Sequence, residues 1–164
     1  MSVLEQIVEL LKGHRIEFNE TEHAPTLTSE DSARERGDDL ASGAKAIVYK
    51  IQDEFKLFVF PADQKMDTKK IKAYFKEQGL RVKKTRFATP EELDSMTGLV
   101  PGSVPPFGQP ILNLSLCVDP SLGSNEWINF NAGSLTHSIR MSYEDYIKIS
   151  GATIFDFIQN QEQE

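Results

Sequence analysis

The sequence predicts a single compact domain of the α+β class, with a mixed, mostly antiparallel and barrel-like sheet flanked by short helices. Its 164 residues are too few for two ordinary domains, and 39% of them are hydrophobic, which is enough for a core. Pairs of strand-like apolar segments are interleaved with short amphipathic segments, an order typical of this class. We expect the domain to cover residues 1–158 and a polar tail over residues 159–164 to fray.

Two helices and a hairpin are expected in the N-terminal third. Apolar residues recur with helical spacing from Val3 to Leu11, and Gly13 ends the pattern. Thr28 can cap a second helix with an acidic first turn, where the helix dipole favours negative charge. Two apolar runs separated by the polar residues 52–54 predict a buried hairpin. The expected elements are a helix over 3–13, a strand over 16–19, a helix over 28–37, and strands over 46–51 and 55–60.

The remaining two thirds predict short helices between further strands. Thr89 and Glu92 have the spacing of a capping box, with Pro90 at the first helical position. Residues 101–108 contain three prolines and two glycines, so this segment, here called the proline loop, cannot be helical. The expected elements are helices over 67–78, 90–97 and 143–149, and strands over 81–87, 111–118, 126–130 and 138–141.

The charge is distributed unevenly along the chain. The net charge is −7, but residues 65–86 hold nine bases and two acids, so this stretch carries +7 and the rest carries −14. A basic face on an acidic protein can still contact a few phosphates, because the local potential governs the approach of a polyanion. The alternative is a solvated lysine-rich helix and an edge strand protected from aggregation.

Several kinds of active site find no support in the sequence. Cys117 is the single cysteine and lies in an apolar run, so we expect a buried hydrophobe and no thiolate metal site. The three histidines form no metal-binding pattern, and no phosphate-binding loop, dinucleotide fingerprint or nucleophile elbow occurs. We therefore expect neither metal nor cofactor. No apolar run approaches ~18–20 residues and the start lacks a signal-peptide pattern, so a cytoplasmic protein without a membrane partner is expected.

Three features remain as candidates for chemistry. Lys45 opens an apolar strand after a run of small residues, from where its ammonium could project into a cleft; otherwise it is a solvated lysine at a strand end. The proline loop is stiff, and Gly102 and Gly108 allow close approach of a ligand; otherwise it is a rigid connector. Residues 131–134 could present backbone N–H groups or form a plain turn.

These features together resemble the YbaK and prolyl-tRNA synthetase-associated editing-domain family along nearly the whole chain. The markers are Lys45, a G-x-x-x-P pattern from Gly102 to Pro106 followed by Phe107, and the segments 23–30, 87–93 and 130–134. Each marker is weak alone, but their order and spacing make the match specific. One branch of the family has a histidine within the segment corresponding to residues 130–134, where this chain has none.

The resemblance implies a free-standing, metal-independent deacylase that hydrolyses the ester of a mischarged tRNA, with tRNA-Pro carrying Ala, Cys or a similar small amino acid as the expected substrate. By position it implies Lys45 and Gly102 as catalytic residues. It implies substrate-binding roles for Thr28, Ser103, Val104, Pro105, Pro106, Phe107, Gly133 and Ser134. The basic stretch would then guide the acceptor stem, through Lys69, Lys70, Lys72, Lys83 and Lys84.

Such chemistry needs few special residues. An aminoacyl ester is already activated, so a positioned water and a donor to the oxyanion suffice. A non-catalytic tRNA-binding or synthetase-associated module is the second hypothesis, and a small-molecule hydrolase is the third. The sequence leaves open the edited amino acid and tRNA, any aminoacyl-tRNA synthetase partner, the proton-transfer group and the oligomeric state.

Overall fold

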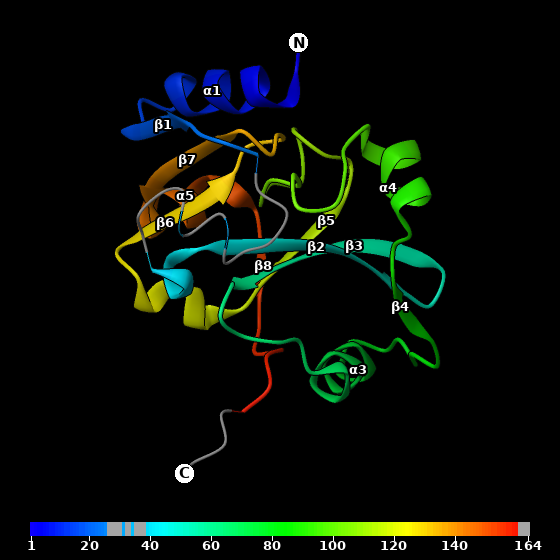
Figure 1. Ribbon diagram of the computed structural model, residues 1–164. Helices are drawn as coiled ribbons and strands as arrows, with labels where there is room; N and C mark the ends of the chain where they lie inside the picture. The colour runs from blue at the N-terminus through cyan, green and yellow to red at the C-terminus, as the bar shows by residue number, and fades with distance from the viewer. Residues whose placement is uncertain (26–30, 32–33, 35–38, 161–164) are drawn as a thin grey trace.

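A five-stranded mixed sheet lies at the centre of the computed structural model, which describes residues 1–25, 31, 34 and 39–160 (Figure 1). The strand order is β4-β2-β3-β5-β8. β2 is antiparallel to both β4 and β3, whereas β5 is parallel to both β3 and β8. The strands are β2 (Ala44–Ile51), β3 (Glu54–Pro61), β4 (Thr85–Phe87), β5 (Ser115–Val118) and β8 (Thr153–Ile154).

A second, three-stranded antiparallel sheet has the order β1-β7-β6. Its strands are β1 (Phe18–Glu22), β6 (Trp127–Asn131) and β7 (His137–Ser142). A parallel bridge between Gly43 and Asn129 joins this sheet to the start of β2. The two sheets therefore meet at one corner, where β2 and β6 lie side by side (Figure 1).

Side-chain caps define where the helices begin. Ser2 and Glu5 form a capping box at the first helix, and Thr89 and Glu92 form another. Asp67 caps a third helix, as the sequence predicts. The helices are α1 (Val3–Gly13), α3 (Thr68–Glu77), α4 (Pro90–Thr97) and α5 (Tyr143–Ser150), with 3₁₀ turns at Leu40–Ser42 and Pro120–Ser124. None of the helices in the described ranges is long and apolar enough to cross a membrane.

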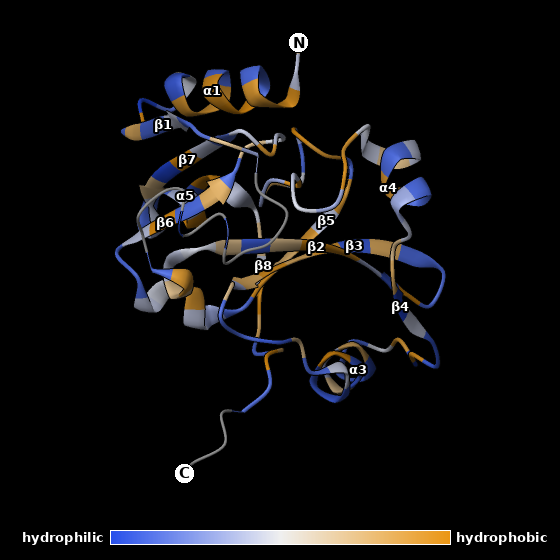
Figure 2. Cartoon of the chain, in the orientation of Figure 1, coloured by the Kyte–Doolittle hydropathy of each residue, from blue (hydrophilic) through white to orange (hydrophobic). Residues whose placement is uncertain are grey.

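Apolar side chains pack on both faces of the five-stranded sheet. On one face they meet α1, α4, α5, the second sheet and the proline loop. Here the Phe107 ring makes edge-to-face contacts with the rings of Phe130 and Tyr146. On the other face an aromatic cluster packs under α3 and the C-terminal segment. Figure 2 shows the hydrophobic stripes of the central strands between these two layers. α3 and the proline loop consequently lie on opposite sides of the sheet (Figure 1).

Three predicted strands differ from the observed ones because other groups use their backbone N–H groups. The strand expected over 16–19 begins at Phe18, since the Ile16 N–H bonds to the end of α1. The strand expected over 81–87 shortens to β4, since the Lys83 and Lys84 N–H groups bond to the Gln52 side chain. The strand expected over 111–118 begins at Ser115, after a turn closed on the Gly108 carbonyl. The helix expected over 28–37 lies mostly outside the described residues.

Candidate active site

The junction of β2 and β6 places Lys45 and Asn131 on one face. Gly43, which bridges Asn129, has an extended backbone with φ −71° and ψ 126°. Alternate residues of an extended strand point to the same side, so Lys45 follows Gly43 and Asn131 follows Asn129 on a common face. The Asn129 amide also donates to the Ser42 hydroxyl at 3.2 Å across this junction. Lys45 and Asn131 each follow a bridged residue by two positions.

The Lys45 ammonium is available to an anion. The side chain is exposed, and its partner across the hairpin, Phe60, is buried and apolar. No carboxylate lies within ion-pair distance of Lys45 in the described part of the chain, whereas Lys56 and Lys70 each have one. An exposed cation at a strand end, with an apolar residue beside it, can bind a phosphate without first giving up an internal ion pair.

Internal hydrogen bonds hold the proline loop in place. The Ser103 hydroxyl donates to the Val100 carbonyl at 2.7 Å and also receives the Val100 N–H at 3.2 Å. At the other end, the Tyr146 hydroxyl donates to the Pro106 carbonyl at 2.6 Å within the core. Burial raises the pKa of Tyr146 well above its ordinary value, so this hydroxyl keeps its proton. The side chains from Ser103 to Phe107 are buried, and a ligand could meet this segment mainly through its backbone.

Asn131 connects the proline loop to the Lys45 face. Its side-chain amide donates to the Gly102 carbonyl at 2.7 Å. The N–H of the same peptide unit, that of Ser103, donates to the Val100 carbonyl at 3.1 Å. Both ends of the Gly102–Ser103 peptide are therefore fixed. Gly102 has φ 88°, a left-handed conformation that glycine adopts without strain.

The fixed Gly102–Ser103 peptide has a backbone N–H donor on either side, that of Gly102 and that of Val104. Among the residues that the structure describes, the N–H groups of Gly102 and Val104 have no hydrogen-bond partner. Val104 is only 7% exposed, and buried backbone N–H groups are seldom left unpaired. An unpaired donor beside a stiff loop is the arrangement that stabilises a developing oxyanion.

A second chain of hydrogen bonds reaches Asn131 from β1. The Ser138 hydroxyl donates to the Asn131 side-chain oxygen at 3.1 Å and lies 2.7 Å from His23 Nε2. His23 Nδ1 lies 2.8 Å from the Ala24 carbonyl, which can only accept, so this nitrogen carries a proton. Asn131 is consequently oriented from both sides, by Ser138 at its oxygen and by Gly102 at its nitrogen.

The other residues expected to bind substrate have different surroundings. Gly133 has φ 76°, and a Cβ there would lie 2.7 Å from Val3 of α1, so its backbone packs closely on that helix. The Ser134 hydroxyl accepts the Thr136 N–H at 3.0 Å in the turn after β6. The Phe107 ring is 2% exposed and belongs to the core. Thr28 lies outside the described residues.

The lysines of the basic stretch do not form one group. Lys70 binds Asp156 at 3.0 Å and Asn160 at 2.9 Å on the side of α3 that faces the C-terminal segment. Lys69 is exposed and Lys72 is half-buried. Lys83 and Lys84 precede β4 and are exposed. Because α3 packs on the same face of the sheet as Lys45, these residues and the lysine share a side of the molecule.

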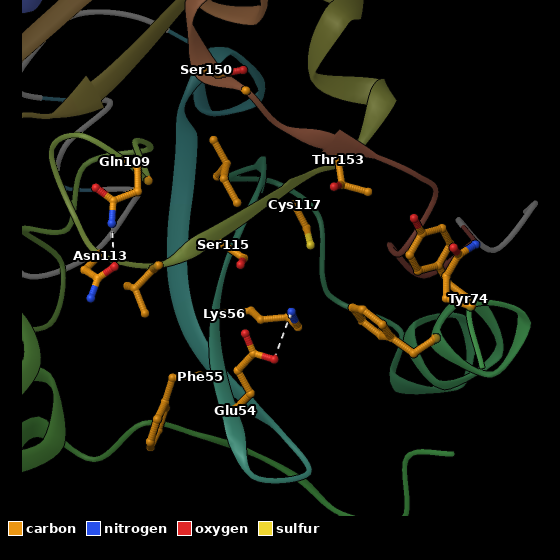
Figure 3. Close-up of a pocket in the computed structure, with 16 residues that line it drawn as sticks. Glu54, Phe55, Lys56, Tyr74, Gln109, Asn113, Ser115, Cys117, Ser150 and Thr153 are labelled. Atoms are coloured by element: carbon orange, nitrogen blue, oxygen red, sulfur yellow. Dashed lines mark hydrogen bonds and ion pairs between the residues drawn. The ribbon is translucent and has the colours of Figure 1, made fainter. Parts of the chain in front are cut away.

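A cavity of about 560 Å³ lies elsewhere, near the turn end of β3 (Figure 3). Of the candidate features that the sequence marks, Gly108 at the end of the proline loop lines it, whereas Lys45, Gly102 and residues 131–134 do not. Lys56 inside it is paired with Glu54 at 3.4 Å. Burial raises the pKa of Cys117 to about 11, so the thiol is neutral and unsuited to nucleophilic attack. This confirms the expectation that Cys117 is a buried hydrophobe, which is 4% exposed.

Sequence reasoning included Asn131 and His23 in the segments 131–134 and 23–30 but gave no role to their side chains or to Ser138. One signal was present: in β6 the residues Ile128 and Phe130 alternate with Asn129 and Asn131, which indicates a strand with one polar face. The contacts themselves join residues 115 positions apart for His23 and Ser138, which no local pattern encodes.

Comparisons with known proteins agree with this architecture. The family profile described as aminoacyl-tRNA editing domain matches residues 23–149. A protein of Escherichia coli (strain K12) named multifunctional Ser/Thr-tRNA deacylase ProXp-y is 31% identical over 159 residues, covering 93% of this chain and 91% of the relative.

Two solved structures share the fold. One, provisionally described as a trans-editing enzyme for prolyl-tRNA synthetase, has a TM-score of 0.79 at 22% identity and covers 98% of this chain and 99% of its own. Another, described as a hypothetical protein, has a TM-score of 0.79 at 22% identity over 93% of this chain and 99% of its own. They confirm the predicted α+β fold. The chain belongs to the aminoacyl-tRNA editing domain family.

Proposed function

We propose that this protein is an aminoacyl-tRNA deacylase acting in trans on mischarged tRNA. The observation that carries the proposal is the Asn131 hydrogen bond to Gly102, which ties the donor-bearing loop to the end of β6, the strand that bridges β2 two residues before Lys45. Membership of the editing-domain family supports the same activity. The substrate would be the 3′ end and acceptor stem of an aminoacylated tRNA.

In this proposal each group has a separate task. The Lys45 ammonium binds the terminal adenosine or its phosphate, and the N–H groups of Gly102 and Val104 face the ester carbonyl oxygen. Water attacks the carbonyl carbon, and the bond from that carbon to the ribose oxygen breaks. The ribose oxygen takes up a proton, which leaves a free amino acid and a tRNA with a free hydroxyl. The substrate amine or the neighbouring ribose hydroxyl relays the proton, so a strong protein base is not required.

We propose serine and threonine as the first amino acids to test, with alanine and cysteine on tRNA-Pro as the alternative that the sequence suggests. The Escherichia coli relative is named for Ser/Thr-tRNA, and 31% identity over 93% of this chain makes its substrates the first to examine. A hydroxyl-bearing side chain can be selected strongly only where the pocket supplies a polar partner. Comparison of Ser with Ala and of Thr with Val on the same tRNA measures that partner directly.

The test is a panel of mischarged tRNAs, with loss of the ester followed over time. Release of amino acid by the protein, and its loss in Lys45→Ala with an unchanged melting temperature, is the expected result. Binding of tRNA without release would instead identify a non-catalytic or synthetase-associated module. Neither binding nor release would leave a small-molecule hydrolase on the same scaffold.

A further inference from the structure

Phe87 on the edge strand β4 is an open aromatic ring with a fixed support. The side chain is 59% exposed, although large apolar residues on this sheet are mostly buried. Its partner across the ladder, Tyr49, is 6% exposed, and the two ring centroids lie 5.1 Å apart. The Tyr49 hydroxyl donates to Thr85 at 2.8 Å and lies 3.3 Å from Thr68. The Phe87 ring therefore makes a tilted contact with an immobilised ring and remains largely exposed.

Phe87 and Lys45 lie on the same face of the sheet. Tyr49 is four residues along β2 from Lys45, an even separation, and cross-strand partners such as Tyr49 and Phe87 point to one side. At ~3.3 Å per residue the separation along the strand is about 13 Å. Ile47, between them, is partly exposed. A cation and an aromatic ring thus mark the two ends of one strip of sheet.

Two lysines belong to the elements next to Phe87 and Tyr49. Thr68, which approaches Tyr49, is the first residue of α3, and Lys72 lies one turn further on the same side of the helix. Lys83 comes two residues before β4. Within the described ranges neither lysine has a carboxylate in ion-pair distance, unlike Lys70 on the far side of α3. The strip is therefore positively charged around its aromatic end.

We infer that Phe87 is a stacking platform for a base in the single-stranded 3′ end of the RNA. The inference rests on the proposed function and deepens it, by giving the nucleotides upstream of the terminal adenosine a binding surface. Aromatic rings hold any base by its π face, while nearby lysines hold the phosphates. Stacked bases follow every ~3.4 Å, so the span of about 13 Å along β2 corresponds to about four nucleotides between the ring and the adenosine at Lys45.

The test uses an RNA minihelix with a single-stranded 3′ end, carrying 2-aminopurine at one of the three positions before the terminal adenosine. Stacking quenches 2-aminopurine, so at least one probe should be quenched on binding the wild-type protein. Phe87→Ala and Phe87→Leu should abolish that quenching and weaken binding by about 10-fold, within a range of roughly 5- to 150-fold. Phe87→Tyr should retain both.

The leucine variant separates stacking from general apolar contact, because it keeps an apolar side chain and loses the ring. Ile154→Ala is the matched control: Ile154 is 46% exposed on β8, at the opposite edge of the same sheet, and should leave quenching unchanged. Wild-type affinity in Phe87→Leu, or quenching that persists in Phe87→Ala, would overturn the inference.

The outcomes also separate this inference from the proposed activity. Deacylation of mischarged tRNA that is unaffected by Phe87→Ala, with no quenching at any position, would refute the platform and leave the activity standing. Ring-dependent quenching in a protein that releases no amino acid from any tRNA would support the platform and refute the activity.

Discussion

Removing the Asn131 side chain should reduce turnover far more than it reduces stability. In Asn131→Ala the Gly102 carbonyl loses its donor at 2.7 Å, and the Gly102–Ser103 peptide keeps only its N–H attachment. The peptide can then rotate, which moves the neighbouring Gly102 and Val104 N–H groups out of their common orientation. Asn131→Asp should be worse, since a carboxylate has no proton to donate to that carbonyl and offers Lys45 a competing anion.

The two magnitudes differ enough to be separated. One neutral hydrogen bond contributes about 0.5–1.5 kcal/mol to the free energy of unfolding. This is a small part of the ~5–15 kcal/mol that stabilises an ordinary domain, so Asn131→Ala should remain folded. Misplacing donors by about 1 Å can lower the rate ~100-fold, which corresponds to about 2.7 kcal/mol in the activation free energy. The loss should fall mainly on kcat, because the donors act on the transition state.

Single-turnover deacylation of a mischarged tRNA, measured beside urea unfolding, tests this reasoning. Asn129→Ala is the matched control, because it removes a comparable side-chain hydrogen bond, the one to Ser42 at 3.2 Å, from the same face of β6. We expect a similar stability loss in both variants and a large fall in kcat only at Asn131. A kcat within twofold of wild type in Asn131→Ala would refute the role of the fixed peptide.

Three further predictions follow from individual contacts. Lys45→Met should abolish deacylation and change the free energy of unfolding by no more than about ±0.5 kcal/mol. Lys50→Met on the same strand should keep turnover, and equal losses of deacylation in both variants would contradict a specific role of Lys45. Tyr146→Phe should lower unfolding free energy by about 1–3 kcal/mol in denaturant titrations, because a buried carbonyl of the proline loop loses its donor. The hydrogen bond from Arg86 lowers the pKa of Glu92 to about 2, so Glu92→Gln should lower the melting temperature at neutral pH. Because the pKa of Glu92 is depressed in the native state, the difference in melting temperature between wild type and variant should shrink as pH falls from about 4.5 towards 2. A difference that stays constant with pH would exclude a stabilising role of this ion pair.

The helices could be predicted because their signals are local. The predicted capping box of Thr89 and Glu92 lies within four residues of chain and is observed, and the apolar spacing from Val3 to Leu11 predicts α1, which Ser2 and Glu5 cap in the structure. The strand ends could not be predicted in the same way, because distant groups compete for the same N–H groups. Gln52, for example, binds two N–H groups 31 and 32 positions away and thereby shortens β4.

For the candidate site, the sequence predicts which residues are unusual but not how they meet. Lys45 and the proline loop stand out by composition alone, and their roles remain proposals. The Asn131 contact with Gly102 spans 29 positions and depends on the pairing of β6 with β7, in which Asn131 lies opposite Ser138. A one-residue change in that register would turn Asn131 away from the loop, because alternate residues face opposite sides. Only the tertiary structure contains that information.

The acidic net charge and the basic strip have complementary effects in the proposed reaction. At physiological salt, charges separated by more than ~8 Å are largely screened, so the ammonium groups around Phe87 and Lys45 dominate the potential that an RNA end meets there. The chain outside residues 65–86 carries −14 and gives the remaining surface an opposing, negative potential. In the proposed reaction binding then depends on a few contacts at the 3′ end. A deacylase that surveys many correctly charged tRNAs needs this weak, end-directed binding more than high affinity.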